Sequence, residues 1–177
     1  KSMDEDGIVI YCGSYSKVLS SGMRLGFVCA PAEVMSKIVV AKQVEDVHTN
    51  MLSQMICESF VTSEEYLPHL DKIRALYRRK CALMLDTMDG CFPDDVKYTR
   101  PEGGLFLWIT LPEGCSGMEL HQRTTAAGVA AVPGKPFFAD NIENDRGLRM
   151  NFSVPSLQEI DEGVARMGAV LRDFLQK

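Results

Sequence analysis

The first feature of this sequence that could do chemistry is a lysine among small and hydroxyl-bearing residues. Lys17 follows Ser14 and Ser16 closely, and Arg24 lies seven residues after it. A lysine amine forms an imine with a carbonyl group when it is available in its neutral form. Serine hydroxyls, backbone N–H groups and an arginine are the donors that hold a phosphate group. Together they favour a site for a phosphorylated cofactor, although Lys17 taken alone is most simply a solvated surface residue.

A second candidate is Arg149, in an apolar segment near the C-terminus. In the run from Leu148 to Phe152, apolar and polar residues alternate. In a strand this alternation sends Leu148, Met150 and Phe152 to one face, and Arg149 and Asn151 to the other. The planar guanidinium group of an arginine binds a carboxylate through two parallel hydrogen bonds. A surface ion pair is the alternative interpretation, which the alternation leaves open.

The elements that position Lys17 are predicted to be two buried strands and the helices that follow them. Short continuous apolar runs at 7–11 and 25–30 are typical of strands in a sheet covered on both faces. The Lys17 loop connects them, and α/β proteins usually carry their chemistry on such loops. Apolar residues at helical spacing then predict two helices from residue 32 onward, with a break at 46–49.

A long helix over 64–88 leads into the segment that carries Arg149. We expect its basic residues, Arg74, Arg78, Arg79 and Lys80, to lie on a solvated face. Strands are predicted at 96–99, 105–111, 129–132 and 147–154, and a helix is predicted at 118–127. The last helix opens with Ser156 and Glu159 at capping-box spacing. The fold class is therefore α/β, with the end of a larger domain over 1–65 and a small α+β domain over 66–177, entered through the long helix.

Composition excludes several classes of function. The 177 residues are 46% hydrophobic and 24% charged with a net charge of −5, which is typical of a globular protein and disfavours nucleic-acid binding by this segment. The chain contains no apolar run that could span a membrane and no signal-peptide pattern, so we expect a cytoplasmic location. The six cysteines and three histidines lack zinc-site spacing, and no metal is expected.

Four segments, in order along the chain, resemble the pyridoxal-phosphate-dependent aminotransferases of fold type I, class I/II. They read GSYSKVLSSGMRLGFVCAP, RPEGGLFLWITLP, GVAAVPGKPF and LRMNFS. Within that family the chain is most similar to the group of 2-aminoadipate, kynurenine and aromatic amino acid aminotransferases. The resemblance implies that residues 1–65 are the tail of the large cofactor-binding domain and 66–177 the small domain, so that the chain is the C-terminal portion of a longer enzyme.

The resemblance also implies roles for individual residues. Lys17 matches the lysine that carries pyridoxal 5′-phosphate and moves a proton between the substrate Cα and the cofactor. Ser14, Ser16 and Arg24 match residues that bind the cofactor phosphate, and Arg149 matches the arginine that binds the substrate α-carboxylate. Substrates would be an amino acid and a 2-oxo acid, and the protein would be a homodimer.

The sequence departs from the family pattern in two ways. Ser21 stands where the family commonly has a proline, and only sixteen residues precede Lys17. The aspartate, asparagine, tyrosine and aromatic residue that hold the cofactor ring in the family lie further upstream, so we expect the chain alone to be inactive. Two alternatives stay open: an aminotransferase-like effector domain of a winged-helix transcription regulator, and a cofactor-free domain that serves folding or dimerisation.

Overall fold

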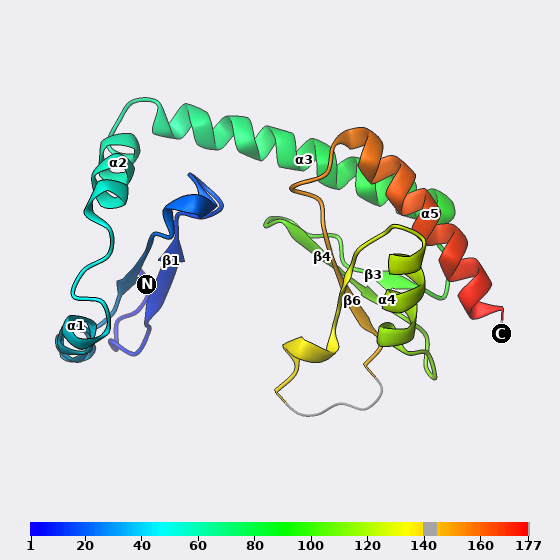
Figure 1. Cartoon of the computed structure of the whole chain (residues 1–177), viewed down its shortest axis with the longest axis horizontal. Helices are drawn as coiled ribbons and strands as arrows, with labels where there is room; N and C mark the ends of the chain where they lie inside the picture. The colour runs from blue at the N-terminus through cyan, green and yellow to red at the C-terminus, as the bar shows by residue number, and fades with distance from the viewer. Residues whose placement is uncertain (140–144, 177) are drawn as a thin grey trace. The chain divides into compact units, whose positions relative to one another are not determined.

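The computed structural model describes residues 1–139 and 145–176, and these residues form two compact units (Figure 1). We call Lys1–Lys72 unit 1 and Ile73–Lys177 unit 2. The division falls inside the long helix α3, Tyr66–Cys91, so that its first turns belong to unit 1 and the rest to unit 2. The predicted long helix is confirmed, and it continues through Gly90 to Cys91.

Unit 1 contains a two-stranded antiparallel sheet followed by helices. Its elements are the strands β1 (Tyr11–Ser14) and β2 (Gly26–Cys29), the short 3-10 helix η1 (Ser21–Met23), and the helices α1 (Ala32–Glu45) and α2 (Met51–Val61). The predicted break at 46–49 is confirmed, since α1 ends before it and α2 begins after it.

The first strand was predicted at the wrong place and with the wrong burial. It begins at Tyr11 rather than at residue 7, and the residues of β1 and β2 are mostly exposed. The Asp4 carboxylate accepts hydrogen bonds from the backbone N–H groups of Ile8 (3.0 Å) and Val9 (3.2 Å), which competes with strand pairing there. Tyr11 pairs with Cys29, and Pro31, two residues further along, has no N–H to extend the ladder.

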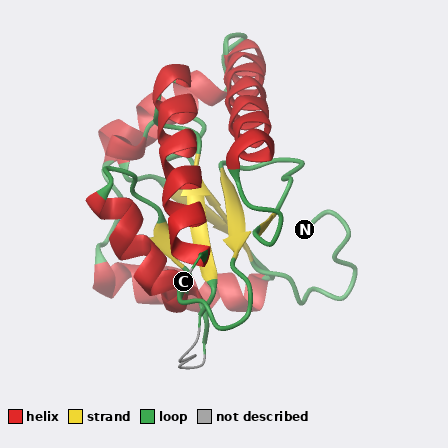
Figure 2. Ribbon diagram, turned by 90° about the vertical axis from the view of Figure 1, so that its right-hand side faces the viewer, coloured by secondary structure: helices red, strands yellow, loops and turns green. Residues whose placement is uncertain are grey.

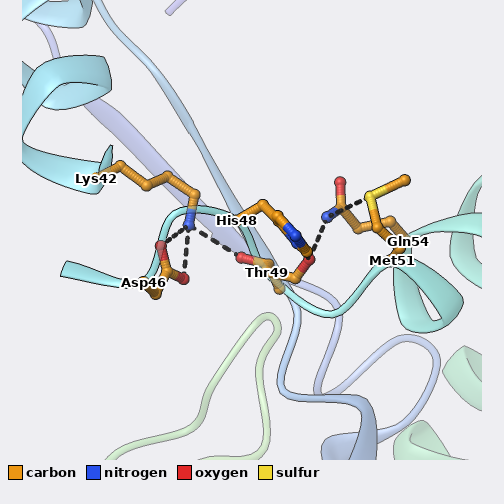
Figure 3. A network of polar contacts seen from close by, with 6 residues as sticks. All are labelled: Lys42, Asp46, His48, Thr49, Met51 and Gln54. Atoms are coloured by element: carbon orange, nitrogen blue, oxygen red, sulfur yellow. Dashed lines mark hydrogen bonds and ion pairs between the residues drawn. The ribbon is translucent and has the colours of Figure 1, made fainter. Parts of the chain in front are cut away.

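A network of polar contacts closes the connection between α1 and α2 (Figure 3). Lys42 in α1 donates to both carboxylate oxygens of Asp46, at 2.7 and 2.8 Å, and to the Thr49 hydroxyl at 3.1 Å. From the other side, the Gln54 amide in α2 donates to the Thr49 carbonyl at 2.7 Å. Both helices are therefore fastened to the same connecting segment.

Unit 2 is a four-stranded antiparallel sheet covered on one face by helices (Figures 1 and 2). The strand order is β3-β4-β6-β5, and β4 pairs with β6 so that Trp108 lies opposite Arg149. The strands are β3 (Lys97–Tyr98), β4 (Phe106–Thr110), β5 (Val132–Pro133) and β6 (Gly147–Asn151). The helices are α4 (Gly117–Ala126), α5 (Leu157–Leu175) and the second part of α3, with the short 3-10 helix η2 at Lys135–Phe137.

Alternation along β4 and β6 separates a core face from an open face. Leu107, Ile109, Leu148 and Met150 are buried in one cluster with side chains of α3, α4 and α5. The opposite face carries partly exposed residues, Phe106, Trp108, Thr110, Arg149 and Asn151. The predicted alternation around Arg149 is therefore confirmed, and the sheet presents this arginine away from the core.

Lys80 does not lie on the solvated face predicted for the basic residues of α3. Its side chain is buried, and its ammonium group donates to the Ser153 carbonyl at 2.8 Å. A buried charge is tolerated when it is hydrogen-bonded. Lys80 thereby connects α3 to the segment that follows β6, a contact between residues far apart in the sequence.

The predicted capping box at the start of α5 is confirmed. The Ser156 hydroxyl accepts from the Glu159 N–H at 3.2 Å, and the Glu159 carboxylate accepts from the Ser156 N–H at 2.7 Å. Hydrogen bonds from Ser156, chiefly from its backbone N–H, hold the pKa of Glu159 below its usual value.

Among the described residues, no helix is long and apolar enough to cross a membrane.

We predict that Glu159→Gln reduces the pH dependence of stability on the acid side. A carboxylate whose folded pKa is lowered contributes stability above its unfolded pKa, and this contribution is lost as the pH falls through the folded pKa. Urea unfolding of wild type and variant at neutral pH and below about pH 4 measures the difference. An unchanged pH dependence in the variant would contradict the prediction.

Candidate active site

The loop between β1 and β2 brings four of the predicted site residues together. Ser14 ends β1, Ser16 and Lys17 follow it, and Arg24 is the last residue before the buried Leu25. The backbone of this loop is held at both ends. The Tyr15 N–H donates to the Leu25 carbonyl at 3.0 Å, and the Leu19 N–H donates back to the Tyr15 carbonyl at 2.8 Å.

Two further contacts within unit 1, made by His69 and by Phe27, hold this loop in place. His69, in the first turns of α3, places its Nε2 2.8 Å from the Val18 carbonyl oxygen. Because a carbonyl only accepts hydrogen bonds, Nε2 carries the proton in this contact. The Tyr15 ring packs on Phe27 of β2 with ring centroids 5.6 Å apart, and burial raises the pKa of Tyr15. The residues on both sides of Lys17 are therefore anchored, while the Lys17 side chain is exposed.

The donors around Lys17 fit the phosphate group of a cofactor. The Ser14 oxygen accepts from the Ser16 N–H at 3.2 Å, which leaves the Ser14 hydroxyl hydrogen free to donate. Arg24 uses one guanidinium nitrogen to donate to the Ser21 carbonyl at 3.1 Å and keeps its other N–H groups for an anion. Hydroxyls and a guanidinium group are strong donors to phosphate oxygens.

Arg24 also has an unusual backbone conformation. Its φ of 51° places it in the left-handed region, at the end of η1. A residue other than glycine carries a cost of about 1 kcal/mol or more there, and such strain is often found at functional sites. The conformation ends the 3-10 helix η1 two residues before β2 begins.

Arg149 lies in unit 2, and its guanidinium group is in contact with two aromatic rings. The guanidinium carbon is 4.2 Å from the ring centroid of Phe106 in β4 and 4.6 Å from that of Phe137 in η2. Such cation–π contacts use the face of the guanidinium group, whereas its N–H donors project in its plane. The half-buried arginine is therefore held while it keeps donors for a carboxylate.

A cavity of about 360 Å³ adjoins Arg149. Phe106, Val132 and Pro133 give it apolar walls, and Arg149, Asn151 and His121 supply polar groups. The His121 Nδ1 donates to the Ala131 carbonyl at 2.7 Å, which fixes the ring against the edge strand. The walls are suited to an apolar group attached to a carboxylate.

A buried aspartate supports the turn that carries Phe137. One oxygen of the Asp145 carboxylate accepts from the Gly147 N–H at 2.8 Å, and the other has no hydrogen-bond partner among the described residues. Gly134 packs directly against this carboxylate, because a β-carbon at 134 would lie 2.7 Å from both oxygens. The turn from Gly134 to Phe137 thus rests on Asp145.

We predict that Asp145→Asn stabilises unit 2. The amide keeps an acceptor for the Gly147 N–H and replaces a buried carboxylate of which one oxygen has no hydrogen-bond partner in the described part of the chain. The free energy of unfolding, measured by urea denaturation, is expected to rise by about 1 kcal/mol. A loss of stability instead would show that the charge of Asp145 is used in the folded state.

Sequence reasoning missed three residues of this arrangement. His69, Phe137 and Asp145 support the loop, the arginine and the turn through contacts with residues distant in the sequence. Phe137 ends the segment GVAAVPGKPF, which gave it no role, and neither a motif nor a spacing marked His69 or Asp145. Trp108 is half-buried on the open face and packs edge to face against Phe137, with centroids 5.8 Å apart. Within 1–139 and 145–176, no three His, Cys, Asp or Glu side chains gather to hold a metal ion.

The chain belongs to the aminotransferase class I and II family, which matches residues 1–167. It is 43% identical to a 2-aminoadipate transaminase of Thermus thermophilus over 94% of the chain and 42% of that relative. A crystal structure of LysN, the α-aminoadipate aminotransferase of the same species, complexed with N-(5′-phosphopyridoxyl)-L-leucine, matches with a TM-score of 0.90 at 42% identity. That match covers 95% of the chain and 43% of the solved one.

A transcription regulator is also similar, at lower identity. The HTH-type transcriptional regulator YdfD of Bacillus subtilis is 25% identical over the whole chain and 36% of its own length. The chain thus spans less than half the length of each of these relatives. The higher identity to the 2-aminoadipate transaminase favours an aminotransferase over the regulator alternative.

Proposed function

We propose that this chain supplies the cofactor lysine, the phosphate donors and the carboxylate-binding arginine of a pyridoxal-phosphate-dependent aminotransferase. The observation that carries the proposal is the anchored loop in which the exposed Lys17 stands among Ser14, Ser16 and Arg24. Membership of the aminotransferase class I and II family supports the same chemistry.

The roles follow from the chemistry of each group. Pyridoxal 5′-phosphate, when bound, supplies a carbonyl carbon and a ring that accepts electrons. Lys17 would hold the cofactor at that carbonyl, and its amine would be the group that moves a proton to and from the substrate Cα. Ser14, Ser16 and Arg24 would donate to the phosphate oxygens and would hold the group independently of Lys17.

Arg149 binds the α-carboxylate of the substrate through its in-plane N–H donors. Its contacts with Phe106 and Phe137 leave those donors available, and the adjoining cavity accepts an apolar group. An amino acid and a 2-oxo acid share this carboxylate, so one arginine serves both halves of an amino transfer.

A second part of the proposal concerns the longer protein to which this chain would belong. We propose that these 177 residues are the C-terminal portion of a homodimeric, cytoplasmic aminotransferase. They span 42% of the length of the Thermus thermophilus relative, which supports a longer protein but not its oligomeric state or location. Residues that tune the cofactor ring come from elsewhere in that protein. We therefore expect little or no amino transfer by the chain alone.

The test is to add pyridoxal 5′-phosphate to the purified chain, record its absorbance spectrum, reduce with borohydride and map the labelled peptides by mass. Selective labelling of Lys17 is expected, because only this lysine has phosphate donors beside it in the loop. Labelling spread over the exposed lysines, or none, would contradict the proposal and favour the cofactor-free alternative.

A further inference from the structure

Two rings from separate segments of unit 2 converge on one arginine. Phe106 begins β4, whereas Phe137 ends η2, thirty-one residues later, and both place their ring centroids within 4.6 Å of the Arg149 guanidinium carbon. Each ring is itself partly exposed, at 38% and 47%. The face of an aromatic ring attracts a guanidinium group, so each of these contacts is favourable.

Contacts within unit 2 hold both rings in place beside Arg149. Phe106 lies opposite Asn151 in the β4–β6 pairing, directly beside the strand that carries Arg149. Phe137 is held through the turn that rests on Asp145 and through its edge-to-face contact with Trp108 at 5.8 Å. Trp108 is the cross-strand partner of Arg149. Both rings are thus connected to the same strand pair as the guanidinium group.

In the described part of the chain, the Arg149 guanidinium group has no hydrogen bond or ion pair, and it contacts the rings of Phe106 and Phe137. An arginine side chain has about 2 kcal/mol of rotamer entropy to lose when it is held in one position. Rings that hold it beforehand reduce the entropy that a ligand must remove.

We infer that Phe106 and Phe137 are positioning residues that hold Arg149 ready to bind a carboxylate before any ligand arrives. This inference rests on the proposed role of Arg149. It adds that two rings of unit 2 set the orientation of the arginine, which has no acidic partner among residues 1–139 and 145–176. The ligand class is a monocarboxylate with an apolar substituent, which the cavity beside Arg149 accommodates.

The test uses the whole 177-residue chain with ¹⁵N-labelled arginine and follows the Arg149 Nε–Hε NMR signal during titration with 4-methylpentanoate. This probe has a carboxylate and an apolar tail but no amino group. Arg149→Lys assigns the signal and serves as the variant without a guanidinium group. Phe106→Leu and Phe137→Leu each remove a ring and keep apolar volume, whereas Phe137→Tyr restores the ring.

We expect the rings to shift the Arg149 signal away from those of exposed arginines, and each leucine variant to reverse part of this shift. Each leucine variant should weaken carboxylate binding about twofold to fivefold, the effect of one cation–π contact. Phe137→Tyr should bind as the wild type does. Phe138→Leu is the matched control, because Phe138 adjoins Phe137 and packs on Trp108 without a cation–π contact to Arg149 in the described structure.

Two outcomes would overturn the inference, and only one of them would also overturn the proposed role of Arg149. If the carboxylate moves the Arg149 signal and both leucine variants bind as tightly as the wild type, the rings do not position the arginine and its proposed role stands. If the carboxylate leaves the signal unmoved in the wild type, the proposed role of Arg149 fails together with the inference. Two leucine variants on different elements keep the test valid if one of them does not fold.

Discussion

Lys17→Ala is expected to eliminate the borohydride-fixed label that pyridoxal 5′-phosphate leaves on this chain. The label requires an amine beside the phosphate donors, and the loop offers no other lysine between Ser14 and Arg24. In a longer protein that contains the chain, the same change should lower turnover by about 10²–10⁴-fold or more, since it removes both the attachment point and the proton carrier. Peptide mass mapping measures the first effect and steady-state kinetics the second.

The matched control is Lys37→Ala, which removes an exposed lysine of α1 that lies outside the loop. It should leave the label in place. Arg24→Gln should weaken labelling without abolishing it, because the amine remains while the strongest phosphate donor is lost. Equal labelling of wild type and Lys17→Ala would show that the attachment is nonspecific and would refute the role assigned to Lys17.

Gly168→Ala should be among the most damaging single-methyl additions in unit 2. Gly168 is the point at which α5 approaches α3, and a β-carbon there would lie 2.7 Å from the Cys91 sulfur and 2.8 Å from the Cys91 carbonyl oxygen. That carbonyl accepts a hydrogen bond from Arg172 at 2.5 Å, so it cannot withdraw freely. We expect the free energy of unfolding to fall by about 1–3 kcal/mol, as overpacking does in other cores.

Gly163→Ala in the same helix provides the control. Its β-carbon would have no neighbour within 4 Å, so only the intrinsic helix preference changes. Alanine is favoured over glycine inside a helix by about 0.5–1 kcal/mol, and this variant should be more stable than the wild type. Urea unfolding followed by far-ultraviolet circular dichroism compares the two. A Gly168→Ala variant as stable as the wild type would show that α3 and α5 separate without cost.

Local patterns in the sequence were sufficient for most elements and for the face on which Arg149 lies. The break between α1 and α2, the capping box at Ser156 and the alternation in β6 depend on neighbours within a few residues. Such short-range preferences can be read without knowing the fold. Side-chain types in the Lys17 loop were likewise enough to propose a phosphate site, which stays a prediction.

The first strand shows where local reading fails. Ile8, Val9 and Ile10 are β-branched and apolar, so they resemble a buried strand. Whether a strand forms depends on a partner, and β2 offers backbone groups only to residues from Tyr11 onward. Burial depends on what covers the sheet, which a run of apolar letters does not specify.

The sequence by itself therefore determined the residue types, the periodicities and the family of this chain. Only the tertiary structure decided that Lys80 is buried against Ser153, that His69 supports the Lys17 loop, and that Phe106 and Phe137 meet at Arg149. These contacts join residues separated by 12 to 73 positions. Their free energy arises from packing and hydrogen bonding between elements, which no local preference encodes.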